Sequence, residues 1–203
     1  RERFRDKFQE DKRLITRLAS AYYNRGLDNR IASNLDKAIA DHTKAIEVRP
    51  DFYQAYNSRG FAYAEKNEYD TAIADYDKAI ELRPDNAATY DNRGTAYLRK
   101  GEFDKAIADF GKVTEIRPDD ANAYCDRGVA YWFKGMTDNA MADFDRAIEL
   151  KPGHPVTHFI RGKVYAEKGE FDQAIGDFDK AIEILPSLSV AYNDRGEVYA
   201  EKD

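Results

Sequence analysis

Apolar and small residues follow a helical spacing through most of the chain, in short segments of similar length. In residues 87–100, Tyr90, Gly94 and Tyr97 recur at positions i, i+4 and i+7, which places them on one face of a helix. A second stripe occupies residues 103–116 and consists of Phe103, Ala106, Ile107, Phe110, Val113 and Ile116. The pattern predicts two consecutive amphipathic helices.

The residues around these two stripes predict where each helix begins and ends. Gly101 follows the first stripe, where a glycine commonly ends a helix, and Asp104 lies in the first turn of the second. Pro118 follows the second stripe, and a residue without an N–H group cannot continue a helix. We therefore predict a helical hairpin in which Gly94 and Ala106 are small so that the two backbones approach closely.

The same hairpin pattern returns every 34 residues. An Arg-Gly pair marks each return, and its glycines are Gly26, Gly60, Gly94, Gly128, Gly162 and Gly196. Self-similarity at a fixed period of this length is typical of stacked arrays, in which each unit contacts mainly its neighbours.

This repeat resembles the tetratricopeptide repeat family. The resemblance rests on Tyr90, Gly94, Tyr97, Ala106, Phe110, Val113, Pro118 and their counterparts, in register across residues 19–188. It implies an all-α fold, a right-handed superhelical solenoid of antiparallel helix hairpins. The expected repeats are residues 19–52, 53–86, 87–120, 121–154 and 155–188, followed by 189–203 as the first helix of a truncated sixth.

Residues 1–18 fit no repeat. Phe4, Phe8, Ile15 and Leu18 are spaced nearly as on a helix, and neither Gly nor Pro interrupts them. We expect an N-terminal helix that caps the first hairpin, whether separate from its first helix or continuous with it.

The arginine of each Arg-Gly pair stands where the family usually has leucine, between small residues that suit close packing. A partly buried guanidinium needs a counter-charge, because desolvation of an unpaired charge is costly. An aspartate follows each of the first five arginines by sixteen residues: Arg25 with Asp41, Arg59 with Asp75, Arg93 with Asp109, Arg127 with Asp143, and Arg161 with Asp177. We expect structural Arg–Asp pairs, formed within a hairpin or with the neighbouring one. A ladder of arginines that binds an acidic ligand is the alternative, and Arg195, with no such aspartate, is the arginine expected to be open to another partner.

The resemblance also implies a concave groove lined by the first helices of the repeats. Trp132 and Phe133 stand out there, because other repeats have small, aliphatic or charged residues at these places. They either anchor a partner or fill a gap beside the irregular turn "GMTDN". The Lys and Asn pattern with which some family members bind a terminal carboxylate is absent. The expected groove residues are Asn57, Phe61, Asp91, Leu98, Cys125, Val129, Trp132, Phe133, Phe159 and Lys163.

Composition and charge narrow the function classes. The 203 residues include 32 Lys and Arg against 38 Asp and Glu, and the net charge of −6 disfavours nucleic-acid binding. No apolar run is long enough for membrane insertion. Cys125 is the single cysteine, so neither a disulfide nor a cysteine-based zinc site forms within the chain. The sequence favours a cytoplasmic location, but it does not begin with Met, so a periplasmic or secreted location stays open.

Motifs of catalysis are missing. The histidines His42, His154 and His158 form no metal-ligand pair, and nothing resembles a phosphate loop or a nucleophile elbow. We predict no catalytic residues, no metal and no cofactor. The expected function is a non-catalytic scaffold that binds a protein or peptide, extended or helical, in its groove. The alternatives are a scaffold that assembles with itself through its uncovered terminal helices, and an accessory domain of a larger enzyme or secretion assembly.

Overall fold

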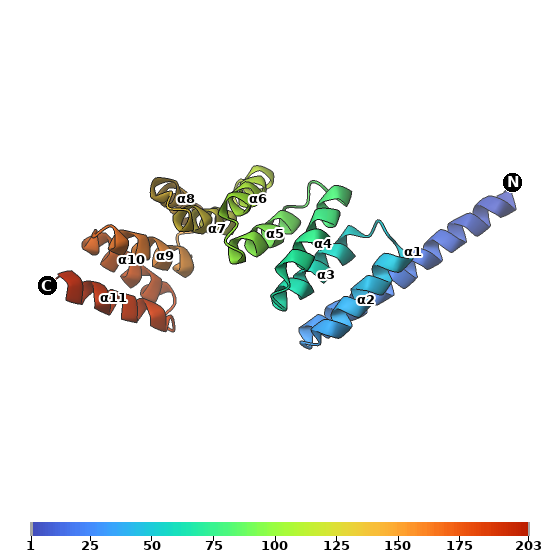
Figure 1. Cartoon of the computed structure of the whole chain (residues 1–203), viewed down its shortest axis with the longest axis horizontal. Coiled ribbons are helices and arrows are strands. Elements are labelled where there is room, and N and C mark those ends of the chain that lie inside the picture. The colour runs from blue at the N-terminus through green and yellow to red at the C-terminus, as the bar shows by residue number, and fades with distance from the viewer. Residues whose placement is uncertain (1, 203) are drawn as a thin grey trace. The chain divides into compact units, whose positions relative to one another are not determined.

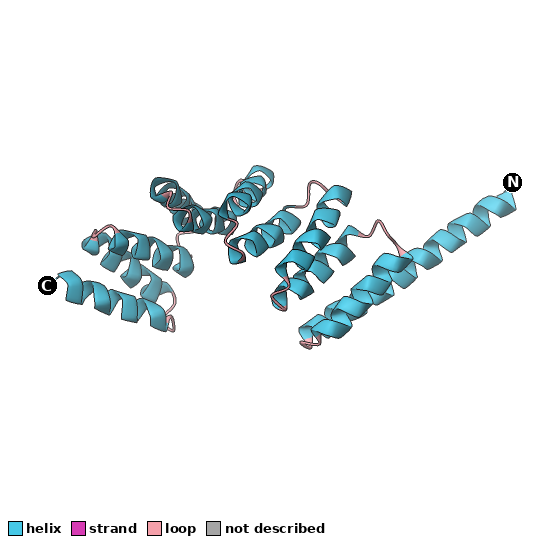
Figure 2. Ribbon diagram, in the orientation of Figure 1, coloured by secondary structure: helices cyan, strands magenta, loops and turns pink. Residues whose placement is uncertain are grey.

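The computed structural model describes residues 2–202, and within that range the side chains of residues 10–202. The described residues form helices joined by short loops, with no strand among them (Figures 1 and 2). The helices are α1 (Glu2–Ile31), α2 (Leu35–Val48), α3 (Tyr53–Glu65), α4 (Tyr69–Leu82), α5 (Ala87–Arg99), α6 (Phe103–Ile116), α7 (Ala121–Phe133), α8 (Thr137–Leu150), α9 (Pro155–Glu167), α10 (Phe171–Ile184) and α11 (Ser189–Lys202). The fold is all-α, as predicted.

The chain forms two compact units, Arg1–Lys100 and Gly101–Asp203. In the N-terminal unit, α1 pairs with α2 and α3 pairs with α4, while α2 packs on α3 and α4 packs on α5. In the C-terminal unit, α7 pairs with α8 and α9 with α10. The flanking helices α6 and α11 pack on α7 and α10, and α8 packs on α9. Each unit is therefore a stack of helix hairpins, in keeping with the solenoid architecture.

In the hairpins α1–α2, α3–α4, α7–α8 and α9–α10, a glycine of the first helix faces a ring of the second. A Cβ atom on Gly60 would lie 2.8 Å from Cε1 of Tyr76, and one on Gly162 would lie 2.9 Å from Cε1 of Phe178. Real Cβ atoms do not approach a ring carbon so closely, so only glycine lets these helices pack at this distance. The glycine of the Arg-Gly pair is thus a packing requirement of the hairpin.

The turn inside each hairpin needs a residue in the left-handed region of backbone space. Gly135 and Gly169 adopt φ values of 81° and 73° just after α7 and α9. Asn67 and Ser33 take the corresponding turns after α3 and α1, with φ values of 61° and 58°. Glycine adopts this conformation without strain and asparagine tolerates it, which explains how these first helices end.

The N-terminal segment continues the first helix of the first hairpin. Helix α1 has 30 residues, whereas its partner α2 has 14. Ala19 is fully buried, but the side chains of residues 10–18 are all exposed, and those of Phe4 and Phe8 lie outside the described residues. The capping role of residues 1–18 therefore stays a prediction.

Candidate functional site

The arginines of the Arg-Gly pairs bind aspartates of their own hairpins. Arg59 Nε donates to Asp75 Oδ2 at 2.8 Å, and Arg59 Nη2 donates to Asp75 Oδ1 at 2.7 Å. Such bidentate pairs are among the strongest charge-assisted hydrogen bonds in proteins. The same two-bond geometry joins Arg25 to Asp41, Arg127 to Asp143, and Arg161 to Asp177.

The aspartates of these pairs lie inside the protein and not on a binding surface. Asp143 is buried on α8, and Arg127 donates to each of its two carboxylate oxygens at 2.7 Å. A buried carboxylate whose oxygens are both engaged in this way is not accessible to a partner, so Asp143 is a structural residue of its hairpin. Asp109 is also buried, but it belongs to a different unit from Arg93, so the pairing of these two residues stays a prediction.

The third guanidinium nitrogen reaches the preceding hairpin. Arg93 Nη1 donates to Asp77 at 2.5 Å and Arg161 Nη1 to Asp145 at 2.6 Å, while Arg195 Nη1 contacts Asp179 in the same way. The expectation that Arg195 is open to another partner is therefore wrong, because Asp179 already binds it. Of the two pairings that the sequence left open, the one within a hairpin is observed for Asp41, Asp75, Asp143 and Asp177, whereas the contacts with the neighbouring hairpin use other aspartates.

Two arginines find a hydroxyl group where this second aspartate is missing. Arg59 Nη1 donates to Thr43 Oγ1 at 3.1 Å, because Thr43 occupies the place of Asp77. At the place of Asp145 the third repeat has Gly111, and Arg127 Nη1 donates instead to Thr114 Oγ1, one turn further on, at 3.0 Å. These contacts leave little of the guanidinium for an acidic ligand, so they favour a structural role for the arginines.

Aromatic rings complete this seam. The Arg93 guanidinium lies 5.6 Å from the Tyr90 ring and 5.8 Å from the Tyr97 ring, and Arg127 lies similarly between Tyr124 and Tyr131. Cation–π contacts of this kind favour a guanidinium that has lost part of its water.

In the α9–α10 hairpin, His158 stands where its neighbours have tyrosine. Its Nδ1 lies 3.0 Å from Asp177 Oδ1, and its Nε2 lies 3.0 Å from the Pro152 carbonyl oxygen. Burial raises the pKa of Asp177, but the hydrogen bonds from Arg161 and His158 outweigh it, so the pKa lies below its usual value. His158 is thus a buried seam residue that helps keep Asp177 ionised.

An aromatic surface lies on the C-terminal unit. The Trp132 ring stacks on Phe133 with 5.3 Å between centroids, and Phe133 stacks on Phe103 at 5.8 Å. The Lys163 ammonium lies 6.0 Å from the Trp132 ring and 5.8 Å from the Phe159 ring. We call Phe103, Trp132, Phe133 and Phe159 the aromatic surface. Trp132 also packs against a buried core cluster, whereas 57% of Phe133 is exposed, so Phe133 is the ring that a partner meets first.

The orientation of Trp132 is held by a polar contact. Trp132 Nε1 donates to Glu167 Oε2 at 2.7 Å, which joins α7 to α9. An indole with a fixed N–H partner and a stacked neighbour loses little freedom when a ligand binds, and preorganisation of this kind favours affinity.

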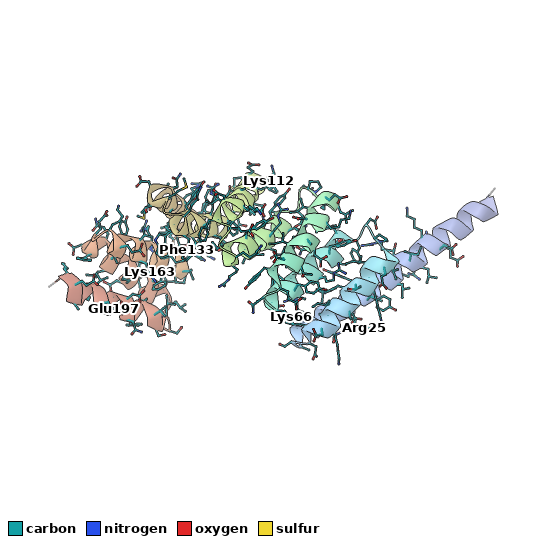
Figure 3. The ribbon with its side chains drawn as sticks, in the orientation of Figure 1. Arg25, Lys66, Lys112, Phe133, Lys163 and Glu197 are labelled. Atoms are coloured by element: carbon teal, nitrogen blue, oxygen red, sulfur yellow. The ribbon has the colours of Figure 1, made fainter. Side chains whose placement is uncertain are left out.

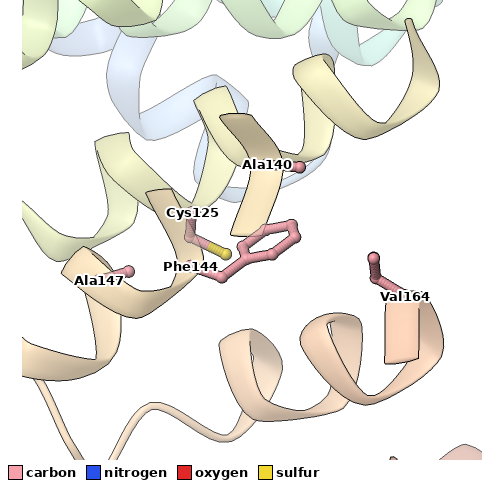
Figure 4. Close-up of a cluster of buried hydrophobic side chains, with 5 residues drawn as sticks. All are labelled: Cys125, Ala140, Phe144, Ala147 and Val164. Carbon is pink, nitrogen blue, oxygen red and sulfur yellow. The ribbon is translucent and has the colours of Figure 1, made fainter. Parts of the chain in front are cut away.

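Two further residues of the expected groove are placed by the core of the C-terminal unit. Val129 is half-buried and packs against the same cluster as Trp132. The prediction that Cys125 lines the groove is wrong, because only 3% of it is exposed and it packs with Phe144 and Val164 (Figure 4). Its small apolar side chain turns inward, and burial raises the pKa of its thiol to about 11, although a hydrogen bond with Thr157 opposes the shift.

A pocket beside the aromatic surface is strongly acidic. It has a volume of about 290 Å³ between α9 and α11, above the ring of Phe178. Lys163 is the only base in its lining, and its Nζ lies 3.9 Å from Asp194 Oδ2. We call this the acidic pocket. Its four carboxylates are Glu167, Asp194, Glu197 and Glu201.

The equivalent place on the N-terminal unit is a pocket of different character. It has a volume of about 540 Å³ between α3 and α5, and its lining includes Phe61, Glu65, Asp91 and Arg99. Its two carboxylates are accompanied by an arginine, so it lacks the large excess of negative charge of the acidic pocket.

The other groove residues expected on the N-terminal unit are partly engaged with neighbours. Asn57 Oδ1 accepts a hydrogen bond from Asn92 at 3.1 Å, and Arg30 lies 4.9 Å from the Phe61 ring. Leu98 is half-buried on α5, and its place in the groove stays a prediction.

Sequence reasoning missed the second aspartates and the acidic pocket, although both left a signal. Asp77, Asp145 and Asp179 each come two residues after a predicted pairing aspartate, in the recurring stretches "DYD" and "DFD". Glu197 and Glu201 occupy, in the sixth repeat, the places one and five residues after the glycine that define groove positions in the other repeats. Extending the repeat register to both sets would have found them.

The described part of the chain offers no site for a metal or a bilayer. No three of its described His, Cys, Asp and Glu side chains are placed together to hold a metal ion. Of its helices, none combines the length and the low charge that crossing a bilayer requires.

Solved structures of repeat proteins are similar to this chain. YrrB, described as a TPR protein with an unusual peptide-binding site, is 26% identical, with 86% of this chain and 90% of YrrB covered and a TM-score of 0.71. MamA is also 26% identical, with 78% and 93% covered and a TM-score of 0.73. A tetratricopeptide repeat protein from Parabacteroides merdae, at 20% identity, shares the fold with a TM-score of 0.79 over 90% of this chain and 73% of that one.

Family models extend the same result over most of the chain. No curated protein matches the sequence. A TPR repeat model matches residues 60–101, 94–135 and 162–203, and two further tetratricopeptide repeat models match residues 43–74 and 121–154. Together with the stacked hairpins, these matches show that the chain belongs to the tetratricopeptide repeat family.

Proposed function

We propose that this protein is a non-catalytic interaction scaffold whose C-terminal unit binds a segment of a partner protein on the aromatic surface. Tetratricopeptide repeats generally serve as protein-interaction scaffolds, so the fold itself supports the broader part of the proposal. The observation that carries the narrower part is the exposed Phe133 ring, stacked between Trp132 and Phe103.

Phe133 is an exposed ring that stacks on two half-buried rings, Trp132 and Phe103. Aromatic side chains supply large contact areas at a low cost in conformational entropy, and they dominate the binding energy of many interfaces. Lys163 and Glu167 border these rings and give the surface a polar rim. An apolar centre with a polar rim is the usual organisation of a specific binding surface.

The arginines are a poor alternative site. Their guanidinium nitrogens donate to aspartates and threonines of the chain itself, and tyrosine rings flank several of them. A ligand would have to displace these contacts, at the cost of leaving buried carboxylates such as Asp75 and Asp143 unpaired.

A peptide selection tests the proposal. Peptides selected from a random display library on the wild-type protein are measured by calorimetry against wild type, Phe133→Ala and Trp132→Phe. We expect Phe133→Ala to weaken binding by about thirtyfold, the size of a typical hot-spot loss. Trp132→Phe keeps the packing but removes the bond to Glu167, so we expect a smaller loss.

Phe61→Ala is the matched control, because it removes an exposed ring from the N-terminal unit. The proposal is overturned if the selected peptides bind Phe133→Ala as tightly as wild type, or if Phe61→Ala has the larger effect.

A further inference from the structure

The part of α1 that precedes the first hairpin carries an apolar stripe with no cover. Leu14, Ile15 and Leu18 are exposed by 65%, 45% and 45%, and their spacing places them on one face of the helix. Large aliphatic side chains grouped on an exposed helix face commonly mark an interaction site.

Two arginines flank this stripe. Arg13 and Arg17 are four residues apart, so they lie one turn apart on the same side of the helix. Glu10 and Asp11 precede them, which concentrates the positive charge toward the end of the segment next to the hairpin. We call residues 10–18 the basic segment.

The acidic pocket has the complementary arrangement. Glu197 and Glu201 are also four residues apart on one helix, α11, and both line the pocket. Figure 3 shows Phe133, Lys163 and Glu197 following one another across the C-terminal unit, so the aromatic surface borders the acidic pocket. A site with rings on one side and paired carboxylates on the other suits a helix with an apolar stripe and paired bases.

A helix could lie against this site in the way that neighbouring helices pack on one another. Its apolar stripe would then contact Trp132 and Phe159 of the aromatic surface, and Arg13 and Arg17 would face Glu197 and Glu201 of the acidic pocket.

We propose that the basic segment of one copy docks on the aromatic surface and acidic pocket of a second copy. This rests on the function proposed above and names its partner: the chain itself. The contact joins different surfaces of two copies, so it is heterologous and leaves one free segment and one free pocket on every dimer. Repetition of the contact forms longer assemblies or closed rings.

Charge reversal on the 203-residue chain tests this proposal, with sedimentation velocity over a range of concentrations as the measurement. We expect the average mass of wild type to rise with concentration. Each of R13E/R17E and E197K/E201K should weaken association about tenfold or more, because like charges then face each other. An equimolar mixture of the two variants should associate again, because each then offers the other a complementary surface. E47K, a charge reversal on an exposed residue of α2, is the control and should behave as wild type.

The results separate this inference from the function on which it rests. A wild type that stays monomeric, variants that associate as tightly as wild type, or a mixture that fails to associate would each overturn self-docking. If peptides from the library still bind wild type and lose affinity for Phe133→Ala in any of these cases, the proposed function stands and only its partner is wrong.

Discussion

The hairpins α1–α2 and α9–α10 fill the same repeat positions with different chemistry. Gly26 faces the ring of His42 in the first, and Gly162 faces the ring of Phe178 in the second. Both rings are almost fully buried, but both ring nitrogens of His42 lack a hydrogen-bond partner. Either ring can pack against the glycine at this repeat position. The imidazole of His42, however, places two polar nitrogen atoms in a site where neither finds a hydrogen-bond partner.

The arginines of the two hairpins differ in their exposure and in the number of aspartates that they bind. Arg25 is 57% exposed and binds a single aspartate, Asp41, which also accepts a hydrogen bond from Asn29. Arg161 is 18% exposed and binds aspartates of two hairpins. The guanidinium is thus buried where a preceding hairpin packs against it and solvated where none does. An arginine and an aspartate sixteen residues apart therefore form pairs that we expect to contribute very differently to the free energy of unfolding.

Removal of the aspartate from each hairpin should give the largest difference between them. Asp177→Ala leaves Arg161 and His158 without their shared partner in a buried site, so we expect a loss of about 3–5 kcal/mol in the free energy of unfolding. Asp41→Ala should cost less, because water can solvate Arg25. Urea denaturation followed by circular dichroism measures both. Equal losses would show that burial of the arginine does not set the strength of the pair.

Acidic pH should weaken the first hairpin selectively. Burial lowers the pKa of His42 to about 4, although Asp41 opposes the shift, whereas an unfolded histidine has a pKa of about 6.5. Between about pH 4 and pH 6.5, His42 is therefore protonated in the unfolded chain but neutral in the folded chain. The associated stability is present above about pH 6.5 and is lost as the pH falls toward 4, by about 3 kcal/mol in total.

Exchange of the two rings tests this effect. His42→Phe should be more stable than wild type, with the difference growing as the pH falls from 7 to 4, and Phe178→His should transfer the sensitivity to the α9–α10 hairpin. Denaturation midpoints at several pH values provide the measurement. A constant difference between His42→Phe and wild type across this range would contradict the assignment.

The repeat made much of this structure predictable. A period of 34 residues places every hairpin glycine, and a fixed offset of sixteen residues brings Arg161 near Asp177 once the hairpin folds. Side-chain direction was harder to predict, because it depends on the chemistry of the individual residue. Cys125 holds the repeat position of Asp91, but a small thiol is more stable in the core whereas a carboxylate stays with solvent. The acidic pocket includes Glu197 and Glu201 of α11, the first helix of the sixth repeat, so the pattern of the five complete repeats does not reveal it.

Glycine-to-alanine substitutions should change stability least, but in opposite directions in the two helices. In α9, a Cβ atom at position 162 would lie 2.9 Å from a Phe178 ring carbon and 3.3 Å from the Ala174 carbonyl oxygen, so Gly162→Ala should destabilise the hairpin by about 1–3 kcal/mol. In α11, nothing lies within 4 Å of the same atom at position 196, so Gly196→Ala should stabilise the helix by up to about 1 kcal/mol. Thermal denaturation and amide hydrogen exchange in each helix measure the two changes. Both substitutions add the same methyl group at the same repeat position, so helix propensity contributes equally to the two changes in stability. If both substitutions changed stability in the same direction, the ring of the second helix would not require a glycine opposite it.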